Sequence, residues 1–122
     1  MKAIATDKAP AALGPYTQAY ENNGTLMASG QIGINPATGK LPATVAEQAE
    51  QACKNVAAIL EEAGYTFDNV IKTTCFLADI ADFGAFNEVY GKYFTSKPAR
   101  SCVAVKDIPA GALCEIEITA VK

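Results

Sequence analysis

The chain of 122 residues is 50% apolar and 19% charged, and its formal net charge is −3. This length and composition fit one globular domain, residues 1–122, with enough apolar surface to bury a core without disulfides or metals. Ten residues are Lys or Arg, but they form no basic run, which argues against a nucleic-acid-binding surface.

The N-terminal segment does not have the pattern of a secretory signal. Asp7 and Lys8 interrupt its apolar stretch, and Pro10 and Pro15 follow. No apolar run approaches the ~20 residues that are needed to span a bilayer. We therefore expect a soluble, cytoplasmic protein.

The first predicted elements form a β-hairpin. Asn23-Gly24 is a dipeptide typical of a tight hairpin turn, and it separates two predicted strands, Tyr16–Glu21 and Gly24–Ile34. A short strand over Ile4–Thr6 would precede the hairpin, and the polar segment Asn35–Lys40 predicts a turn after it.

A long amphipathic helix is predicted over Thr44–Ala63. Apolar residues recur there with a period of 3.6 residues. Thr44 and Glu47 have the spacing of a capping box, and Gly64 is suited to the left-handed conformation that ends a helix.

The second half of the chain predicts two more strands around one helix, and then a final strand. The predicted ranges are a strand over Asn69–Ile80, a helix over Asp82–Phe94, and strands over Ala99–Ile108 and Ala112–Val121. One face of this predicted helix carries a stripe of aromatic residues, which we expect to face the core: Phe83, Phe86, Tyr90, Tyr93 and Phe94. The order of elements indicates an α+β fold in which two helices pack on one face of a mixed β-sheet.

The last predicted strand indicates what covers the other face of the sheet. Strand alternation places one apolar set on one face, namely Cys114, Ile116, Ile118 and Ala120. The opposite face carries Glu115, Glu117, Thr119 and Val121, with Met27 on a neighbouring strand. Because this face is too apolar for full exposure to water, we expect a subunit interface there.

The chain contains no histidine, which excludes a Ser-His-Asp triad, a Cys-His pair and an imidazole base. The four cysteines, Cys53, Cys75, Cys102 and Cys114, are widely spaced and have no metal-site pattern, so we expect buried free thiols.

Arg100 is the only arginine, and it lies at the start of a predicted strand. Its planar fork could bind a carboxylate in a bidentate manner, although a surface ion pair explains most arginines. Glu115 and Glu117 share one strand face, and either could act as an acid or base if it were buried. Tyr16 follows a Gly-Pro turn, so it is either an oriented functional phenol or a packed turn residue.

Five segments together resemble the RidA (YjgF-like) family of reactive intermediate deaminases. They are APAALGPYTQA, SGQIGINPATGKLP, VIKTTCFLADIADFGAFNEVY, PARSCVAV and CEIEITAV. The resemblance implies a chorismate-mutase-like α+β domain that forms a homotrimer with active sites between subunits. It also implies hydrolysis of 2-imino and 2-enamino acids, such as 2-aminoacrylate and 2-iminobutanoate, to 2-keto acids and ammonia without a metal or organic cofactor.

The resemblance also assigns roles to residues. Arg100 would bind the substrate carboxylate, and Glu115 would position or deprotonate the attacking water. Cys102 would offer its backbone groups rather than its thiol. Tyr16, Gly30 and Asn87 would line the cleft. The alternative is a small-molecule-binding or RNA-directed regulatory protein of the same fold, related to the translation inhibitors and ribonucleases described in the family.

Overall fold

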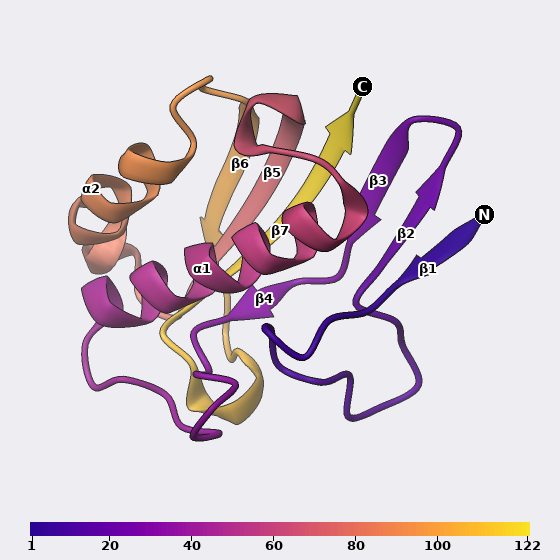
Figure 1. The fold of residues 1–122 in the computed structure, drawn as a ribbon. Helices are drawn as coiled ribbons and strands as arrows, with labels where there is room; N and C mark the ends of the chain where they lie inside the picture. The colour runs from indigo at the N-terminus through magenta and orange to yellow at the C-terminus, as the bar shows by residue number, and fades with distance from the viewer.

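The computed structural model describes residues 1–122, which fold into one seven-stranded sheet and two α-helices (Figure 1). The strands are β1 (Lys2–Ile4), β2 (Ala19–Asn22), β3 (Thr25–Ala28), β4 (Gln31–Ile32), β5 (Val70–Leu77), β6 (Ala99–Ala104) and β7 (Cys114–Val121). The helices are α1 (Val45–Ala63) and α2 (Phe83–Tyr93), and three short 3₁₀ turns cover Phe67–Asn69, Ile80–Asp82 and Pro109–Gly111. Neither α-helix combines the length and apolar character of a membrane span.

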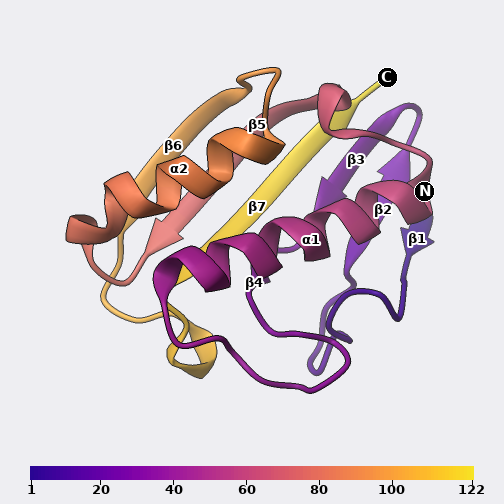
Figure 2. The same ribbon diagram turned by 60° about the vertical axis from the view of Figure 1, so that its left-hand side comes forward.

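The sheet is mixed, as predicted. Its order is β1-β2-β3-β7-β5-β6, and β4 pairs with β7 beside this path. Only β5 and β6 run parallel, and α2 connects them, whereas every other pair is antiparallel. Both helices pack on the same face of the sheet, which leaves the opposite face uncovered (Figure 2). The predicted α+β architecture is therefore confirmed, and β6 is an edge strand.

Helix α1 begins and ends where its capping residues predict. Thr44 is the N-cap, and its hydroxyl oxygen accepts a 3.2 Å hydrogen bond from the amide of Glu47. Gly64 ends the helix at φ 78°, a left-handed conformation that glycine adopts without a steric penalty. Two buried polar side chains then fix α1 to the preceding loop: Gln48 donates to the carbonyl of Pro42, and Asn55 donates to that of Ile34.

The predicted hairpin exists, but its strands are shorter and interrupted. The first strand begins only at Ala19, and the predicted strand Gly24–Ile34 is divided into β3 and β4. The reason is a one-residue shift of register against β7. Met27 pairs with Thr119 and Gln31 pairs with Ile116, so four steps on one strand match three on the other. A bulge of this kind bends the strand and re-aims the residues around Gly30.

Alternation along β7 follows the prediction. Its inward residues are almost fully buried under the helices: Cys114, Ile116, Ile118 and Ala120. Its outward residues lie on the uncovered face, where the exposed Val121 of β7 is joined by exposed apolar side chains of other strands: Tyr20, Met27 and Val103. Met27 alone is 62% exposed, so the uncovered face presents large apolar side chains to solvent in the single chain.

The aromatic stripe of α2 is only partly in the core. Phe86, Tyr90 and Phe94 are buried, and the rings of Tyr90 and Phe94 stack with centroids 4.3 Å apart. Phe83, which we expected in the core, is 39% exposed because it lies at the first position of α2, where the helix passes the edge of the sheet.

Candidate active site

Arg100 lies on the edge strand β6 and faces helix α2. It is paired with Thr73 of β5, whose side chain points to the helix-covered face. One guanidinium nitrogen donates a 2.8 Å hydrogen bond to the amide oxygen of Asn87. The guanidinium carbon lies 4.7 Å from the ring centroid of Tyr90 and 5.5 Å from that of Phe83. These distances are those of cation–π contacts.

The surroundings of Arg100 hold no carboxylate partner. Its neighbours are the amide of Asn87 and the two aromatic rings, so the surface ion pair considered above is not formed within the chain. A cleft of about 430 Å³ opens beside the guanidinium, and Phe94, Lys97 and Pro98 help to line it. Because the guanidinium has five donor N–H groups and uses one on Asn87, it can bind an anion in this cleft.

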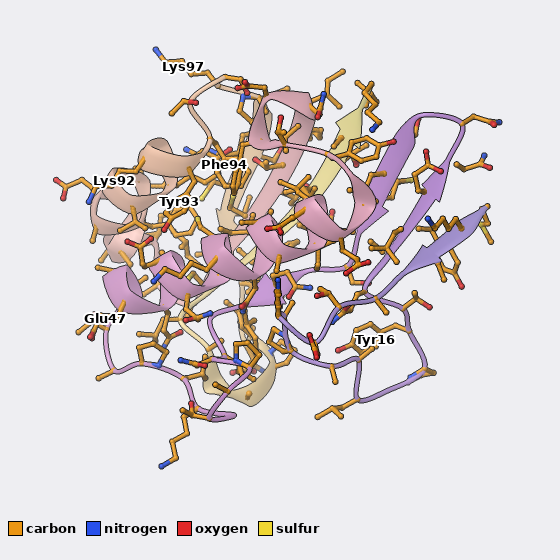
Figure 3. The ribbon with its side chains drawn as sticks, in the orientation of Figure 1. Tyr16, Glu47, Lys92, Tyr93, Phe94 and Lys97 are labelled. Carbon is orange, nitrogen blue, oxygen red and sulfur yellow. The ribbon has the colours of Figure 1, made fainter.

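Lys97 stands at the rim of this cleft rather than inside it. It belongs to the short connection between α2 and β6, and its side chain points away from the fold (Figure 3). Arg100 is therefore the cation directed into the cleft.

Glu115 occupies the opposite, uncovered face of the sheet. It lies across from Phe76 of β5 and Ile32 of β4, and it is half-buried. Burial raises the pKa of the Glu115 carboxyl above its ordinary value of 4.5, and the negative charge of Glu117 raises it further. A carboxyl group in this environment is a stronger proton acceptor than an exposed one.

The two glutamates that share one face of β7 have different surroundings. Glu115 borders a hollow of about 230 Å³, to which Phe76, Val105 and Asp107 also contribute. Glu117 is exposed and does not line that hollow. The carboxyl of Glu115 also rests against the backbone of Gly30, where any side chain would collide with it.

Cys102 lies next to Cys75 in the parallel register of β5 and β6. Burial raises the pKa of the Cys102 thiol, and the positive charge of Arg100 opposes that shift without cancelling it. The thiol is therefore protonated at neutral pH and a poor nucleophile. All four cysteines are free, and three are buried as predicted, whereas Cys102 is half-buried. No group of three or more His, Cys, Asp or Glu side chains could hold a metal ion.

Tyr16 lies in the long loop between β1 and β2, on the opposite side of the fold from Phe94 and Lys97, which line the cleft beside Arg100 (Figure 3). Its side chain is 54% exposed, so it is not a packed turn residue. Tyr16 and Thr17 border a cavity of about 650 Å³ together with Thr6, Gln18 and Glu62. The structure therefore brings Arg100, Asn87 and Cys102 together on one side and Gly30 and Glu115 on another.

Arg100 and Glu115 cannot reach one another within a chain. Strands β6 and β7 flank β5, and the two side chains leave the sheet through opposite faces. A site that uses both residues therefore requires a second copy of the chain.

Sequence reasoning missed three residues that surround Arg100. The sequence pattern places Phe83 and Tyr90 in the aromatic core stripe, and it gives no signal for Thr73. One signal was available: Asn87 interrupts the apolar stripe four residues after Phe83 and three before Tyr90, so all three share a helix face.

The chain is similar in sequence and in fold to known proteins over nearly its whole length. A family model described as endoribonuclease L-PSP matches residues 6–122. A RutC family protein of Aquifex aeolicus is 54% identical, with all of both chains covered. A 2-iminobutanoate/2-iminopropanoate deaminase of Mus musculus is 50% identical and covers 99% of this chain and 91% of the mouse protein.

A crystal structure of Escherichia coli TdcF with bound serine superposes with a TM-score of 0.97 at 41% identity and covers 100% of this chain and 99% of that one. The Escherichia coli YjgF structure gives a TM-score of 0.96 at 45% identity, with 100% and 99% covered. With a family match over nearly its whole length and relatives of about 50% identity, the chain belongs to the endoribonuclease L-PSP family, that of the YjgF/RidA proteins.

Proposed function

We propose that the protein hydrolyses 2-imino and 2-enamino acids to 2-keto acids and ammonia, as a 2-iminobutanoate/2-iminopropanoate deaminase. Relatives from mouse, rat, cattle and Escherichia coli that carry this name are 46–51% identical to the chain. The observation that carries the proposal is the guanidinium of Arg100, which faces a cleft without a carboxylate partner.

Arg100 binds the carboxylate of the substrate in this proposal. Two parallel N–H groups of a guanidinium match the two oxygens of a carboxylate, and this fork fixes the orientation of the neighbouring C2 atom. Asn87 and Tyr90 hold the guanidinium from one side, so its remaining donors face the cleft. The backbone of Cys102, two residues along β6, lies close to where the imine would sit.

Glu115 directs the attacking water. The water oxygen adds to C2 while the imine nitrogen gains a proton, and the resulting carbinolamine loses ammonia as its C–N bond breaks and the carbonyl forms. A carboxyl group whose pKa is raised by burial can accept the proton of water and return it to the leaving nitrogen. Gly30 provides the backbone against which this carboxyl rests. Tyr16 lies away from the Arg100 cleft of its own chain, so in this proposal it lines the site from a neighbouring subunit.

The working unit is a homotrimer with sites between its subunits. Arg100 and Glu115 lie on opposite faces of one sheet, so one chain supplies the carboxylate-binding half and its neighbour supplies the water-binding half. The exposed apolar side chains of Tyr20, Met27 and Val121 give the uncovered face the character of a subunit contact. Light scattering should give about three times the 12.8 kDa chain mass, and a monomer in dilute buffer would contradict the shared site.

Complementation between variants tests the shared site directly. Arg100→Ala and Glu115→Gln chains should each be inactive alone but regain activity when they are unfolded together and reassembled. Random assembly should restore roughly a quarter of the sites, because a site then needs an intact Arg100 from one chain and an intact Glu115 from the other. Continued inactivity of the reassembled mixture would place both residues in one chain's site.

The activity itself is measured by adding the protein to a threonine dehydratase reaction that generates 2-iminobutanoate. Semicarbazide traps the imine that escapes hydrolysis, so an active protein lowers the semicarbazone signal and speeds ammonia release. The matched control is Arg100→Ala. Cleavage of RNA by the parent protein, with no effect on the imine, would instead favour the RNA-directed alternative that the family's description suggests.

A further inference from the structure

We infer that Tyr90 is a positioning residue, which holds the guanidinium of Arg100 in the orientation that receives the substrate carboxylate. This inference rests on the proposed function, because it concerns how the carboxylate-binding arginine is held. Tyr90 is expected to touch Arg100 and not the substrate itself.

The position of Tyr90 is fixed from both ends of its side chain. Its ring is buried and stacks on Phe94 with an interplanar angle of 16°, and it also contacts Phe86. Its hydroxyl oxygen lies 2.8 Å from the hydroxyl oxygen of Thr73, which is fully buried. A buried ring that is packed on one face and hydrogen-bonded at its tip has very little rotational freedom.

Thr73 closes the arrangement through the sheet. It is the residue of β5 that lies directly opposite Arg100 of β6 in the parallel register. The backbone pairing therefore links Arg100 to Thr73, a hydrogen bond links Thr73 to Tyr90, and the cation–π contact of 4.7 Å links Tyr90 back to Arg100. Each of the three contacts restrains the other two, so the guanidinium is held on a rigid support.

This support solves a problem that the position of Arg100 creates. Arg100 lies on an edge strand and is half-buried, and a free arginine side chain samples many rotamers. The negative face of the Tyr90 ring attracts the guanidinium, and Asn87 accepts one of its N–H groups. With one face and one donor occupied, the remaining donors are held toward the cleft before the substrate arrives.

Removing the ring should weaken carboxylate binding without touching the chemistry of water. For Tyr90→Leu we expect kcat/KM to fall about three- to thirtyfold, the range that a cation–π contact of this kind represents. Affinity for 2-ketobutyrate, measured by calorimetry, should fall by the same factor, and the loss should appear mainly in KM. Tyr90→Phe keeps the ring and should stay within about threefold of the parent.

A fluorination series separates electrostatics from packing. Phenylalanine, 4-fluorophenylalanine and 3,4,5-trifluorophenylalanine are incorporated at position 90, which preserves the shape of the ring while its negative face is progressively weakened. We expect 2-ketobutyrate affinity to decline in that order with little change in melting temperature. A merely structural role of Tyr90 predicts no trend, and a flat series would overturn the inference even if Tyr90→Leu failed to fold.

Two further comparisons complete the test. Tyr93→Phe removes a hydroxyl from the same helix, where it donates to Glu50 away from the cleft, and should keep the parental kcat/KM. In an Arg100→Ala background, Tyr90→Leu should cause no further loss, because the group that it positions is gone. Multiplicative losses in the double variant would refute positioning. Parental activity of Arg100→Ala would instead reject the proposed function and this inference with it.

Discussion

Replacing Gly30 by alanine tests whether turnover depends on the position of the Glu115 carboxyl group. A Cβ atom on Gly30 would lie 2.8 Å from Cδ and 3.1 Å from Cγ of Glu115, which is closer than non-bonded carbon atoms approach. The three nearest atoms all belong to that one side chain. Gly30 does not have a positive φ, so alanine fits the backbone and the carboxyl group is the part that must move.

The structure separates the expected costs to stability and to catalysis. Glu115 sits on the uncovered face, where its side chain can rotate away, so the free energy of unfolding should fall by only about 1 kcal/mol. Displacement of a catalytic group by about 1 Å can lower a rate roughly a hundredfold. We therefore expect Gly30→Ala to lower kcat about a hundredfold while 2-ketobutyrate affinity stays near the parental value.

Two other glycines serve as matched controls. At Gly84 on α2, an added Cβ atom would have no neighbour within 4 Å. Gly84→Ala should therefore keep full activity and gain up to ~1 kcal/mol in stability. At Gly33 the built Cβ would lie 2.8 Å from the Cα of Gln48, so Gly33→Ala should destabilise the fold instead. Thermal melting, light scattering and the dehydratase-coupled assay measure all three. Parental kcat for a trimeric Gly30→Ala protein would refute the assigned role of Glu115.

Three further predictions concern the other site residues. Arg100→Ala should lose roughly thirty- to several-thousand-fold in kcat/KM, because truncating one member of a buried charge pair costs about 2–5 kcal/mol. Arg100→Lys keeps the charge but lacks the planar fork, so it should also be seriously impaired. Near-parental rates for both variants would exclude the carboxylate-binding role. Protonation of Glu115 should lower kcat on the acidic side of the pH profile, at a pH above 4.5. Glu115→Gln should lower kcat and remove this acidic limb, whereas Glu117→Gln should do neither. The reverse pattern would exchange the roles of the two glutamates. Cys102→Ala should keep most activity, since its thiol is protonated at neutral pH, and complete loss in a folded trimer would indicate a nucleophilic thiol.

Local sequence signals predicted the elements whose formation depends on local physics. Thr44 and Gly64 mark both ends of α1 because capping is decided within one turn of the helix. The two faces of β7 were predictable because burial alternates with a period of two. The break between β3 and β4 was not predictable, because it arises from a register shift against β7, whose residues paired with Gln31 and Met27 lie 85 and 92 positions further along the chain.

The sequence supplied candidate residues for the site, but not the arrangement that the structure gives them. The sequence alone left Arg100 as either a surface ion pair or a carboxylate-binding fork, and the family resemblance selected the fork, just as it selected Glu115 from two equivalent glutamates. The support of Arg100 by Tyr90 and Thr73 depends on the parallel pairing of β5 with β6, and no local pattern reports that pairing. The sequence pattern of an apolar stripe is the same whether its rings fill the core or contact a guanidinium. Tyr90 is buried and Phe83 is partly exposed, and both rings contact the guanidinium of Arg100.

The proposed shared site accounts for the placement of the two charged groups on opposite faces of the sheet. A cation and a carboxyl group placed in one cleft of a single chain would pair with each other and block the substrate. Placing Arg100 under α2 and Glu115 on the uncovered face keeps the two groups from pairing within one chain. In the proposed trimer, the guanidinium of one chain would face the carboxyl of the next across the bound substrate, at a distance set by the packing of the sheets. If the exposed side chains of Met27 and Val121 form the proposed subunit contact, that contact would set the spacing between the carboxylate-binding and water-binding halves of the site.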